Sequence, residues 1–205
     1  MNTDRERQLE ALHAEVRLCE RCPLSQGRTN AVPGRGPADA EIMFIGEAPG
    51  FHEDQKGVPF VGAAGNFLSE LLEKAGIDRN RVYITNVLKC RPPGNRDPQP
   101  AEVEACKDFL DRQIALIQPR VIVTLGRHSM ARAFPNEKIS AVHGQPRKLG
   151  ALIYFPMYHP AAALHQPSLR STVEADFVKL RQLLNGEGPV EDYTPPPPAE
   201  QLSLF

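Results

Sequence analysis

Four cysteines have the residue type and spacing that most directly suggest chemistry. They follow the pattern Cys19-x2-Cys22-x67-Cys90-x15-Cys106, and four thiolates can bind either a zinc ion or an iron–sulfur cluster. A structural zinc site usually has two Cys-x-x-Cys pairs, and here only Cys19 and Cys22 form one. The spacing therefore favours a cluster. For Cys106, which falls in a predicted helix, a small buried apolar residue is the alternative.

A carboxylate, an aromatic ring, an amide and an imidazole lie in segments that follow predicted strands. Glu47 lies in GEAPG, whose glycines and proline favour a tight turn that brings backbone amides and one carboxylate to a strand end. Phe60 lies in PFVG, and Asn86 lies in TNVLKC, where its side chain could offer a donor and an acceptor to the edge of a base. His159 lies in MYHP. Taken singly, each has an ordinary alternative: a core phenylalanine, a turn asparagine or a surface histidine.

The elements that would position these residues can be predicted from hydrophobic patterns. Short β-branched or aromatic runs predict strands at residues 41–45, 81–85, 121–125 and 151–155. Amphipathic patterns predict helices at residues 5–18, 64–75, 100–117 and 171–184. This alternation favours a parallel sheet between helices, in which ligands collect beyond the carboxyl ends of the strands. Segments 46–60, 86–99 and 157–165 should therefore converge on one site.

The character of the sequence changes after Asn185. Residues 186–200 read GEGPVEDYTPPPPAE, which has too few apolar side chains for a core and a proline run that stays extended. This part has four acidic residues and no Lys or Arg, whereas the whole chain has a net charge of −1. We predict a mildly basic domain over residues 1–185 and a disordered acidic, proline-rich tail over residues 186–205. The small basic excess permits DNA binding without requiring it.

The sequence has no stretch that nears the roughly eighteen apolar residues needed to span a membrane, and its first residues are polar and charged. We therefore predict a cytoplasmic protein with no membrane partner. Disulfide bonds are not expected in that compartment.

The motifs GEAPG, PFVG, TNVLKCRPP and the His-Pro loop occur in this order together with the four cysteines. Jointly they resemble the family 4 uracil-DNA glycosylases, enzymes with a four-iron cluster. The resemblance spans nearly all of the predicted domain. It implies an α/β fold, a three-layer α/β/α sandwich around a central four-stranded parallel sheet. It also implies that Cys19, Cys22, Cys90 and Cys106 bind a [4Fe–4S] cluster, which would act as a structural staple.

The same resemblance assigns a uracil pocket. Its residues would be Glu47, Ala48, Pro49, Glu53, Phe60, Asn86 and His159. The target nucleotide must be flipped out of the DNA, after which Phe60 would stack on uracil and Asn86 would pair with its polar edge. Glu53 would supply bulk at the C5 position and so exclude thymine.

Catalysis is expected to come from Glu47 and His159. Cleavage of the N-glycosidic bond should be dissociative, with positive charge on the sugar and negative charge on the departing uracil. A neutral His159 would donate a hydrogen bond to the uracil oxygen, and Glu47 would position or deprotonate water and stabilise the sugar cation. Free uracil and an abasic site would result. We expect a monomer acting on uracil-containing DNA.

DNA would be gripped by Arg91 and Arg96, and Leu164 would wedge into the gap left by the flipped base. The chain departs from the family in this last loop. Relatives usually have HP-A/S-x-L-L-R, whereas here the segment is HPAAALH, so that His165 stands in place of an arginine. Contact with phosphate at this position should be weaker.

Two other functions stay open from the sequence. One group of the superfamily becomes covalently linked to uracil through a histidine in an inserted basic loop. Its first motif resembles GEQPG, whereas this chain has Ala48, and residues 91–100 contain no histidine. The other alternative is a non-catalytic DNA-binding or redox module, which would have no use for Glu47 and His159 facing a flipped sugar.

The last five residues are Gln201-Leu202-Ser203-Leu204-Phe205. They resemble the short peptide with which bacterial repair and replication proteins bind the polymerase sliding clamp. Large apolar side chains at the tip of a polar, proline-stiffened spacer are costly to expose without a pocket to receive them. We therefore predict clamp binding, which would raise the effective concentration of the enzyme on DNA. The alternative is an arbitrary apolar terminus or one that folds back on the domain.

Overall fold

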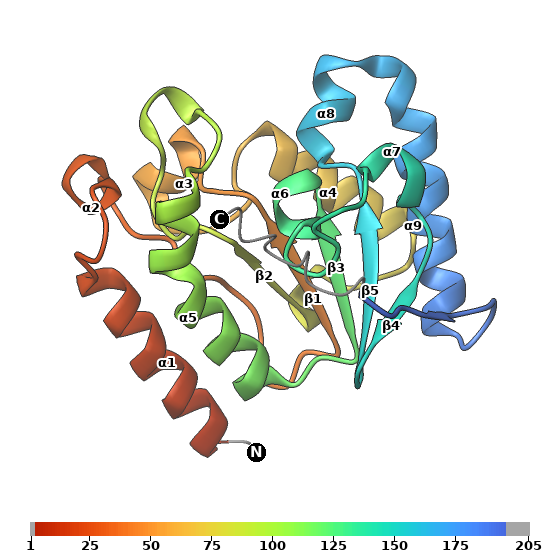
Figure 1. Cartoon of the computed structure of the whole chain (residues 1–205), viewed down its shortest axis with the longest axis horizontal. Coiled ribbons are helices and arrows are strands. Elements are labelled where there is room, and N and C mark those ends of the chain that lie inside the picture. The colour runs from red at the N-terminus through yellow and green to blue at the C-terminus, as the bar shows by residue number, and fades with distance from the viewer. Residues whose placement is uncertain (1–2, 196–205) are drawn as a thin grey trace, which may run out of the picture.

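The computed structural model of the chain describes residues 3–195. Its centre is a six-stranded sheet in the order β2-β1-β3-β5-β4-β6 (Figure 1). The strands are β1 (Ile42–Gly46), β2 (Val82–Asn86), β3 (Val121–Leu125), β4 (Arg147–Leu149), β5 (Leu152–Met157) and β6 (Glu191–Asp192). Strands β2, β1, β3 and β5 are parallel, β4 is antiparallel to β5, and β6 is parallel to β4.

Helices connect the strands and cover the sheet. The α-helices are α1 (Thr3–Leu18), α2 (Leu24–Gly27), α3 (Phe51–Lys56), α4 (Ala63–Lys74), α5 (Pro100–Ile117), α6 (Arg127–Met130), α7 (Ile139–Val142), α8 (Pro160–His165) and α9 (Arg170–Leu184). Three short 3₁₀ helices are η1 (Arg79–Arg81), η2 (Pro93–Asn95) and η3 (Pro167–Leu169). Within residues 3–195, no helix is long and apolar enough to cross a membrane.

The two faces of the sheet are buried by different helices, which gives three layers (Figure 1). Neighbouring residues of a strand point to opposite faces. Met43 of β1 accordingly packs with Leu110 of α5, and α1 packs on α5. The next residue, Phe44, lies in the other core with Phe67 of α4 and Phe177 of α9. Because both faces are covered, all five residues of β1, β2 and β3 are buried.

Local sequence signals set the ends of α5, the helix after the DNA-contacting loop predicted from the sequence. Pro100 occupies the first turn, where its missing N–H costs nothing. Gln99 and Glu102 form a capping box, in which each side chain accepts from the backbone N–H of the other residue. The helix ends at Gln118, which has left-handed backbone angles. These signals fix the start of α5 close to the loop that precedes it.

The predicted α/β/α sandwich and its four parallel strands are confirmed, with element ends within about two residues of those predicted. The sheet is larger than the four strands expected, because β4 and β6 extend it at one edge. Both are too short, at three and two residues, to produce a recognisable alternation in the sequence.

The structured part of the chain also continues past Asn185, where a disordered tail was predicted to begin. Strand β6 pairs with β4, and the Tyr193 backbone N–H donates to the Lys148 carbonyl at 2.8 Å. The Tyr193 ring meets the Phe134 ring edge to face at 4.7 Å, and the Arg147 guanidinium lies over it at 5.6 Å. One aromatic side chain thus anchors residues 186–195. The five terminal residues predicted to bind a clamp lie outside the described residues.

The stacked pair Phe44 and Phe177, with ring centroids 6.2 Å apart, joins α9 to the sheet. Phe177 is 2% exposed, whereas its neighbour Val178 is 57% exposed. We expect Phe177→Ala to lower the free energy of unfolding by about 3–5 kcal/mol because it leaves a cavity. The control Val178→Ala should change it by less than about 0.5 kcal/mol. Urea unfolding measures both, and equal effects would contradict this packing.

Candidate active site

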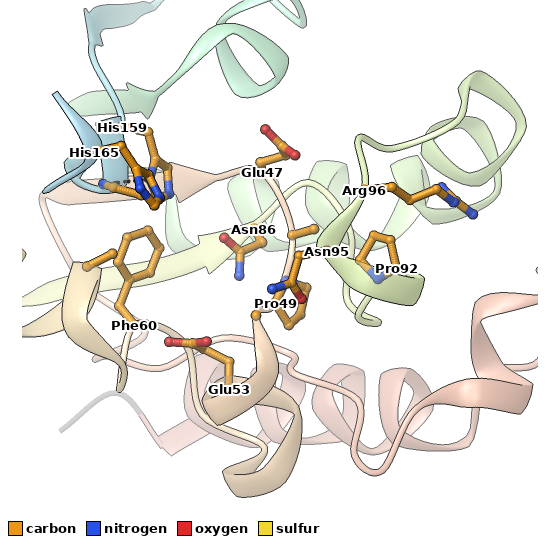
Figure 2. A pocket seen from close by; sticks show the side chains of 14 residues that line it. Glu47, Pro49, Glu53, Phe60, Asn86, Pro92, Asn95, Arg96, His159 and His165 are labelled. Carbon is orange, nitrogen blue, oxygen red and sulfur yellow. Dashed lines mark hydrogen bonds between the residues drawn. The ribbon is translucent and has the colours of Figure 1, made fainter. Parts of the chain in front are cut away.

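A cavity of about 350 Å³ lies beyond the carboxyl ends of β1, β2 and β5, within the size range of small-ligand sites. Figure 2 shows side chains from several loops turned toward it. The lining residues are Glu47, Ala48, Pro49, Gly50, Glu53, Phe60, Ala64, Asn86, Pro92, Asn95, Arg96, His159, Ala161 and His165. All seven residues predicted to bind uracil are therefore brought together.

The floor of the cavity depends on Gly46, the last residue of β1. Gly46 pairs in register with Asn86 at the end of β2. A Cβ at Gly46 would overlap Oδ1 of Asn86 and approach the Phe60 ring to 2.9 Å. The glycine therefore lets the buried amide of Asn86 and the ring of Phe60 reach the same space. The Lys89 ammonium, which is fully buried, holds this strand end by donating to the Asn86 carbonyl at 2.8 Å.

Phe60 is held in a conformation that few residues other than glycine adopt. Its φ is +53°, in the left-handed region. Its carbonyl accepts a hydrogen bond from Arg79 at 2.9 Å, and a Cβ at Gly65 would overlap that carbonyl. The ring is 6% exposed and lies 5.5 Å from the His159 ring, centroid to centroid. The surrounding contacts thus fix the ring as one wall of the cavity.

Glu53 shapes the same wall from α3. Its Oε1 accepts hydrogen bonds from the backbone N–H groups of Val61 and Gly62, at 3.0 and 2.9 Å. In Figure 2 its carboxylate extends into the cavity below Phe60. Glu53 therefore both lines the pocket and holds the segment that follows Phe60.

His159 has a defined protonation pattern because it caps α8. Its Nδ1 accepts the backbone N–H of Ala161 at 3.1 Å, so that in the neutral ring the proton lies on Nε2. Burial lowers the pKa of His159 to about 4, and the nearby Glu53 carboxylate opposes this shift only in part. The imidazole is therefore neutral near pH 7, with one N–H available as a donor.

Glu47 is half-buried and follows β1 directly. Burial raises the pKa of its carboxyl. The charge of His128 opposes the increase, that of Asp97 adds to it, and that of Arg127 opposes it. Its backbone carbonyl accepts from Leu88 N–H at 3.0 Å, which ties this turn to the segment after β2.

The loop between β2 and α5 forms another wall. The Arg91 Nε donates to Asn95 Oδ1 at 2.7 Å, and Asn95, with φ +55°, lines the cavity. Arg96 makes a bidentate ion pair with Glu102 at 2.9 and 2.5 Å. It points away from Asn86 and Phe60 in Figure 2. The charge of Arg96 is therefore engaged in holding this loop to the start of α5.

Helix α8 forms the rim opposite this loop. Leu164 is 43% exposed, so it is open to solvent as a wedge residue must be. His165, the residue in place of the usual arginine, lines the cavity itself.

The four cysteines meet at a second, smaller cavity between α1, α5 and the segment after β2. Cys19 and Cys22 are half-buried, and Cys90 and Cys106 are buried. Burial raises the pKa of the Cys90 and Cys106 thiols. Across the described residues, no three of these sulfur atoms lie within 4.8 Å of one another.

Sequence reasoning missed several residues of the site. Asn95 could have been noticed, because a Gly-Asn pair after two prolines indicates a turn. Arg79, which holds Phe60, and His128, whose ring lies 3.8 Å from the Glu47 carboxylate, come from segments without a recognisable motif. Only the folded arrangement brings these two residues to the site.

Sequence comparisons with known proteins identify the family of this chain. The family model for the Uracil DNA glycosylase superfamily matches residues 33–185. A type-4 uracil-DNA glycosylase of Sulfurisphaera tokodaii is 51% identical over 85% of this chain and 84% of its own length. The type-4 enzyme of Saccharolobus solfataricus is 47% identical over 87% and 88% of the two chains. That of Thermotoga maritima is 44% identical over 90% and 98%. The chain therefore belongs to the type-4 uracil-DNA glycosylases, which hydrolyse the N-glycosyl bond of uracil in DNA.

Proposed function

We propose that Glu47 and His159 carry out uracil excision in this chain, on a nucleotide flipped into the cavity beyond β1, β2 and β5. The observation that supports this most strongly is the hydrogen bond from Ala161 N–H to His159 Nδ1. It leaves Nε2–H as the donor of a neutral imidazole inside a cavity that also contains the Glu47 carboxylate. A hydrogen-bond donor and an anion that line one cavity match the two charges that develop during cleavage.

Recognition would precede chemistry. Phe60 provides a fixed aromatic face for stacking, and the buried amide of Asn86 offers both a donor and an acceptor to the base edge. Backbone groups of Glu47, Ala48 and Pro49 line the cavity beside it. Glu53 would reject the methyl group of thymine, because its carboxylate is held by two backbone amides and cannot easily move aside.

The reaction breaks the bond between C1′ of the sugar and N1 of uracil. The bonding electrons leave with uracil, and His159 Nε2–H would stabilise the charge that develops on its oxygen. Water adds to C1′ of the sugar cation, whose charge the Glu47 carboxylate would stabilise, and Glu47 would accept the proton that this water loses. Uracil takes up a proton from solvent on release, and Glu47 returns the proton it accepted to solvent, so one water molecule is consumed and the carboxylate is regenerated.

Removal of either group should abolish most excision. We expect Glu47→Gln and His159→Ala each to lower the single-turnover rate on a uracil-containing oligonucleotide by about 10²–10⁴-fold, the range for a positioned base or oxyanion donor. Glu73→Gln, on the exposed side of α4, is the matched control and should keep the full rate. Circular dichroism should be unchanged in all three. Near-normal turnover would remove that residue from the mechanism.

We also propose that the four cysteines bind a [4Fe–4S] cluster. Four thiols that line one cavity are a ligand set that a four-iron cluster can use. Arg28 supports this assignment, because its guanidinium lies 3.1 Å from Cys90 Sγ and also donates to the Cys19 carbonyl. Such a cation would offset the negative charge of a thiolate-bound cluster. The cluster would join α1 to α5 and to the segment after β2, outside the reaction path.

Purified protein should therefore be brown and contain about four irons and four sulfides per chain. Cys→Ser at position 19, 22, 90 or 106 should lower the iron content and the solubility of the protein. Molecules that remain folded should still excise uracil. Metal analysis of protein made without oxygen measures this directly. Stoichiometric zinc without iron would overturn the assignment.

For DNA contact, we propose Arg91 and Leu164 as the gripping and wedging residues. Leu164 is exposed on the rim, where an apolar side chain could fill the space of a flipped base. Arg91 is half-buried. Its Nε donates to Asn95, and its guanidinium lies 5.1 Å from the centre of the Phe51 ring. Arg96 would act mainly by holding the loop through Glu102. We further propose that the enzyme works as a monomer in the cytoplasm, where its DNA substrate would lie.

The terminal peptide Gln201–Phe205 is proposed to bind a sliding clamp. Because Tyr193 is anchored beside β4, the stretch between this anchor and the terminal peptide is shorter than the sequence suggested. The seven residues 194–200 can span at most about 25 Å. The clamp would therefore be held near the edge of the sheet that β4 and β6 form, and would act by raising effective concentration.

Deletion of residues 201–205 tests this proposal. The truncated chain should excise uracil from a short oligonucleotide at the full rate, because the cavity is built from residues 47–165. It should lose binding to a purified bacterial sliding clamp in a titration. Leu202→Ala with Phe205→Ala in the full chain should reproduce the loss, whereas Glu200→Ala should not. Equal clamp binding by all forms, or none by the intact chain, would refute it.

A further inference from the structure

Beside the cavity, three charged or titratable side chains from two different segments gather around Glu47. His128 lies on α6, at the carboxyl end of β3, and Asp97 lies in the loop before α5. His128 Nε2 is 3.8 Å from a Glu47 carboxylate oxygen and 3.6 Å from an Asp97 oxygen. One side-chain atom from each of Glu47, Asp97 and His128 lies within 4.8 Å of the other two. Arg127 completes the group by pairing with Asp97.

These contacts act through charge more than through hydrogen bonds. Distances of 3.6 and 3.8 Å are longer than hydrogen bonds. Arg127 Nε donates a hydrogen bond to His128 Nε2 at 3.1 Å, so the neutral imidazole is the acceptor of this bond. When the ring is protonated, its positive charge faces both carboxylates. His128 is half-buried, and interactions at such a position are screened less than those at the open surface.

We propose that His128 and Asp97 are positioning residues that set the charge of Glu47 from outside the uracil-binding cavity, with opposite effects. The proposal rests on the role of Glu47 proposed above. Neither residue lines the cavity, so neither would touch uracil or the reacting sugar. Their effect would pass through the Glu47 carboxylate alone.

The need for such control follows from the position of Glu47. Burial favours its neutral form, which can neither accept a proton from water nor stabilise a sugar cation. The protonated His128 and the Arg127 guanidinium lower the pKa of Glu47, and the Asp97 carboxylate raises it. Asp97 in turn holds Arg127 and faces His128. The balance among these charges therefore decides how much of the enzyme is active at acidic pH.

Of the other charged or titratable groups that line the cavity, Glu53, Arg96 and His159 are already engaged, and His165 is exposed. Glu53 accepts from two backbone amides, and Arg96 is bound in a bidentate ion pair. His159 accepts from Ala161, and its pKa of about 4 keeps it neutral over most of the acidic range. His165 lies on the exposed rim of α8. His128, Asp97 and Arg127 are thus the groups expected to shift the ionisation of Glu47.

The sign of each effect can be stated. The acidic limb of the single-turnover pH profile reports the ionisation of Glu47 in the enzyme–DNA complex. Without the charge of His128, the pKa of Glu47 rises, and the limb moves to higher pH. Without the charge of Asp97, this pKa falls, and the limb moves to lower pH. Because these positions are partly open to solvent, we expect shifts of roughly 0.2–0.7 pH units.

The experiment compares full-length variants on a short uracil-containing oligonucleotide between pH 4.5 and 8, a range set by roughly the ordinary Glu and His pKa values. His128→Asn should move the acidic limb up, Asp97→Asn should move it down, and His128→Lys should restore the limb toward the wild-type position. Asp111→Asn removes a carboxylate of the exposed pair with Arg132 and should leave the profile unchanged. Added salt should reduce both shifts.

Several results would overturn the proposal. A lower rate at every pH with an unmoved limb in both variants would mean that the two residues have a purely structural role. Shifts of the same sign in His128→Asn and Asp97→Asn would also refute it. Failure of the underlying function is distinguishable, because Glu47→Gln would then retain the wild-type rate whatever the two neighbours do.

Discussion

The pairing register of the parallel strands is the constraint on which the site depends. β1 pairs with β2 so that Gly46 lies beside Asn86, and β3 pairs with β5 so that Leu125 lies beside Met157. A slip of one residue would turn each strand-end side chain to the opposite face. Burial on both faces disfavours this slip. Each side chain would move from the core in which it packs into the core on the opposite face of the sheet, and packing would be lost in both. The segments after β1, β2, β3 and β5 therefore meet at one edge.

The low exposure of that edge has opposite consequences for the two proposed catalytic groups. Burial disfavours charge on both. For His159 this is useful, since the neutral ring is the one with Nδ1 bonded to Ala161 and Nε2–H free to donate. For Glu47 it is a cost, because an ionised carboxylate is needed. The charges of His128 and Arg127 on α6 offset that cost, whereas Asp97 in the loop before α5 adds to it. The proposed mechanism thus depends on residues that do not line the cavity.

Hydrophobic periodicity was sufficient to predict the central strands and the long helices. The positions of Glu47, Phe60, Asn86 and His159 after parallel strands were sufficient to predict that these residues meet at one edge of the sheet. The sequence was not sufficient to predict ion pairs and contacts between side chains that only the fold brings close together. No motif indicates that Arg96, which is predicted to grip DNA, also forms an ion pair with Glu102, and nothing about His128 in GRHS indicates a carboxylate nearby. Strand β6 and the anchored Tyr193 were missed because one aromatic residue in a proline-rich segment gives no periodic signal.

The protonation state of His159 is the most direct test of the account, because the proposed chemistry requires a neutral donor with its proton on Nε2. Nitrogen-15 NMR of the imidazole, assigned by comparison with His159→Ala, distinguishes the two tautomers and the doubly protonated ring. At pH 7 we expect an unprotonated Nδ1 and a protonated Nε2, with no further protonation until the pH approaches about 4. An imidazolium at neutral pH, or a proton on Nδ1, would contradict it.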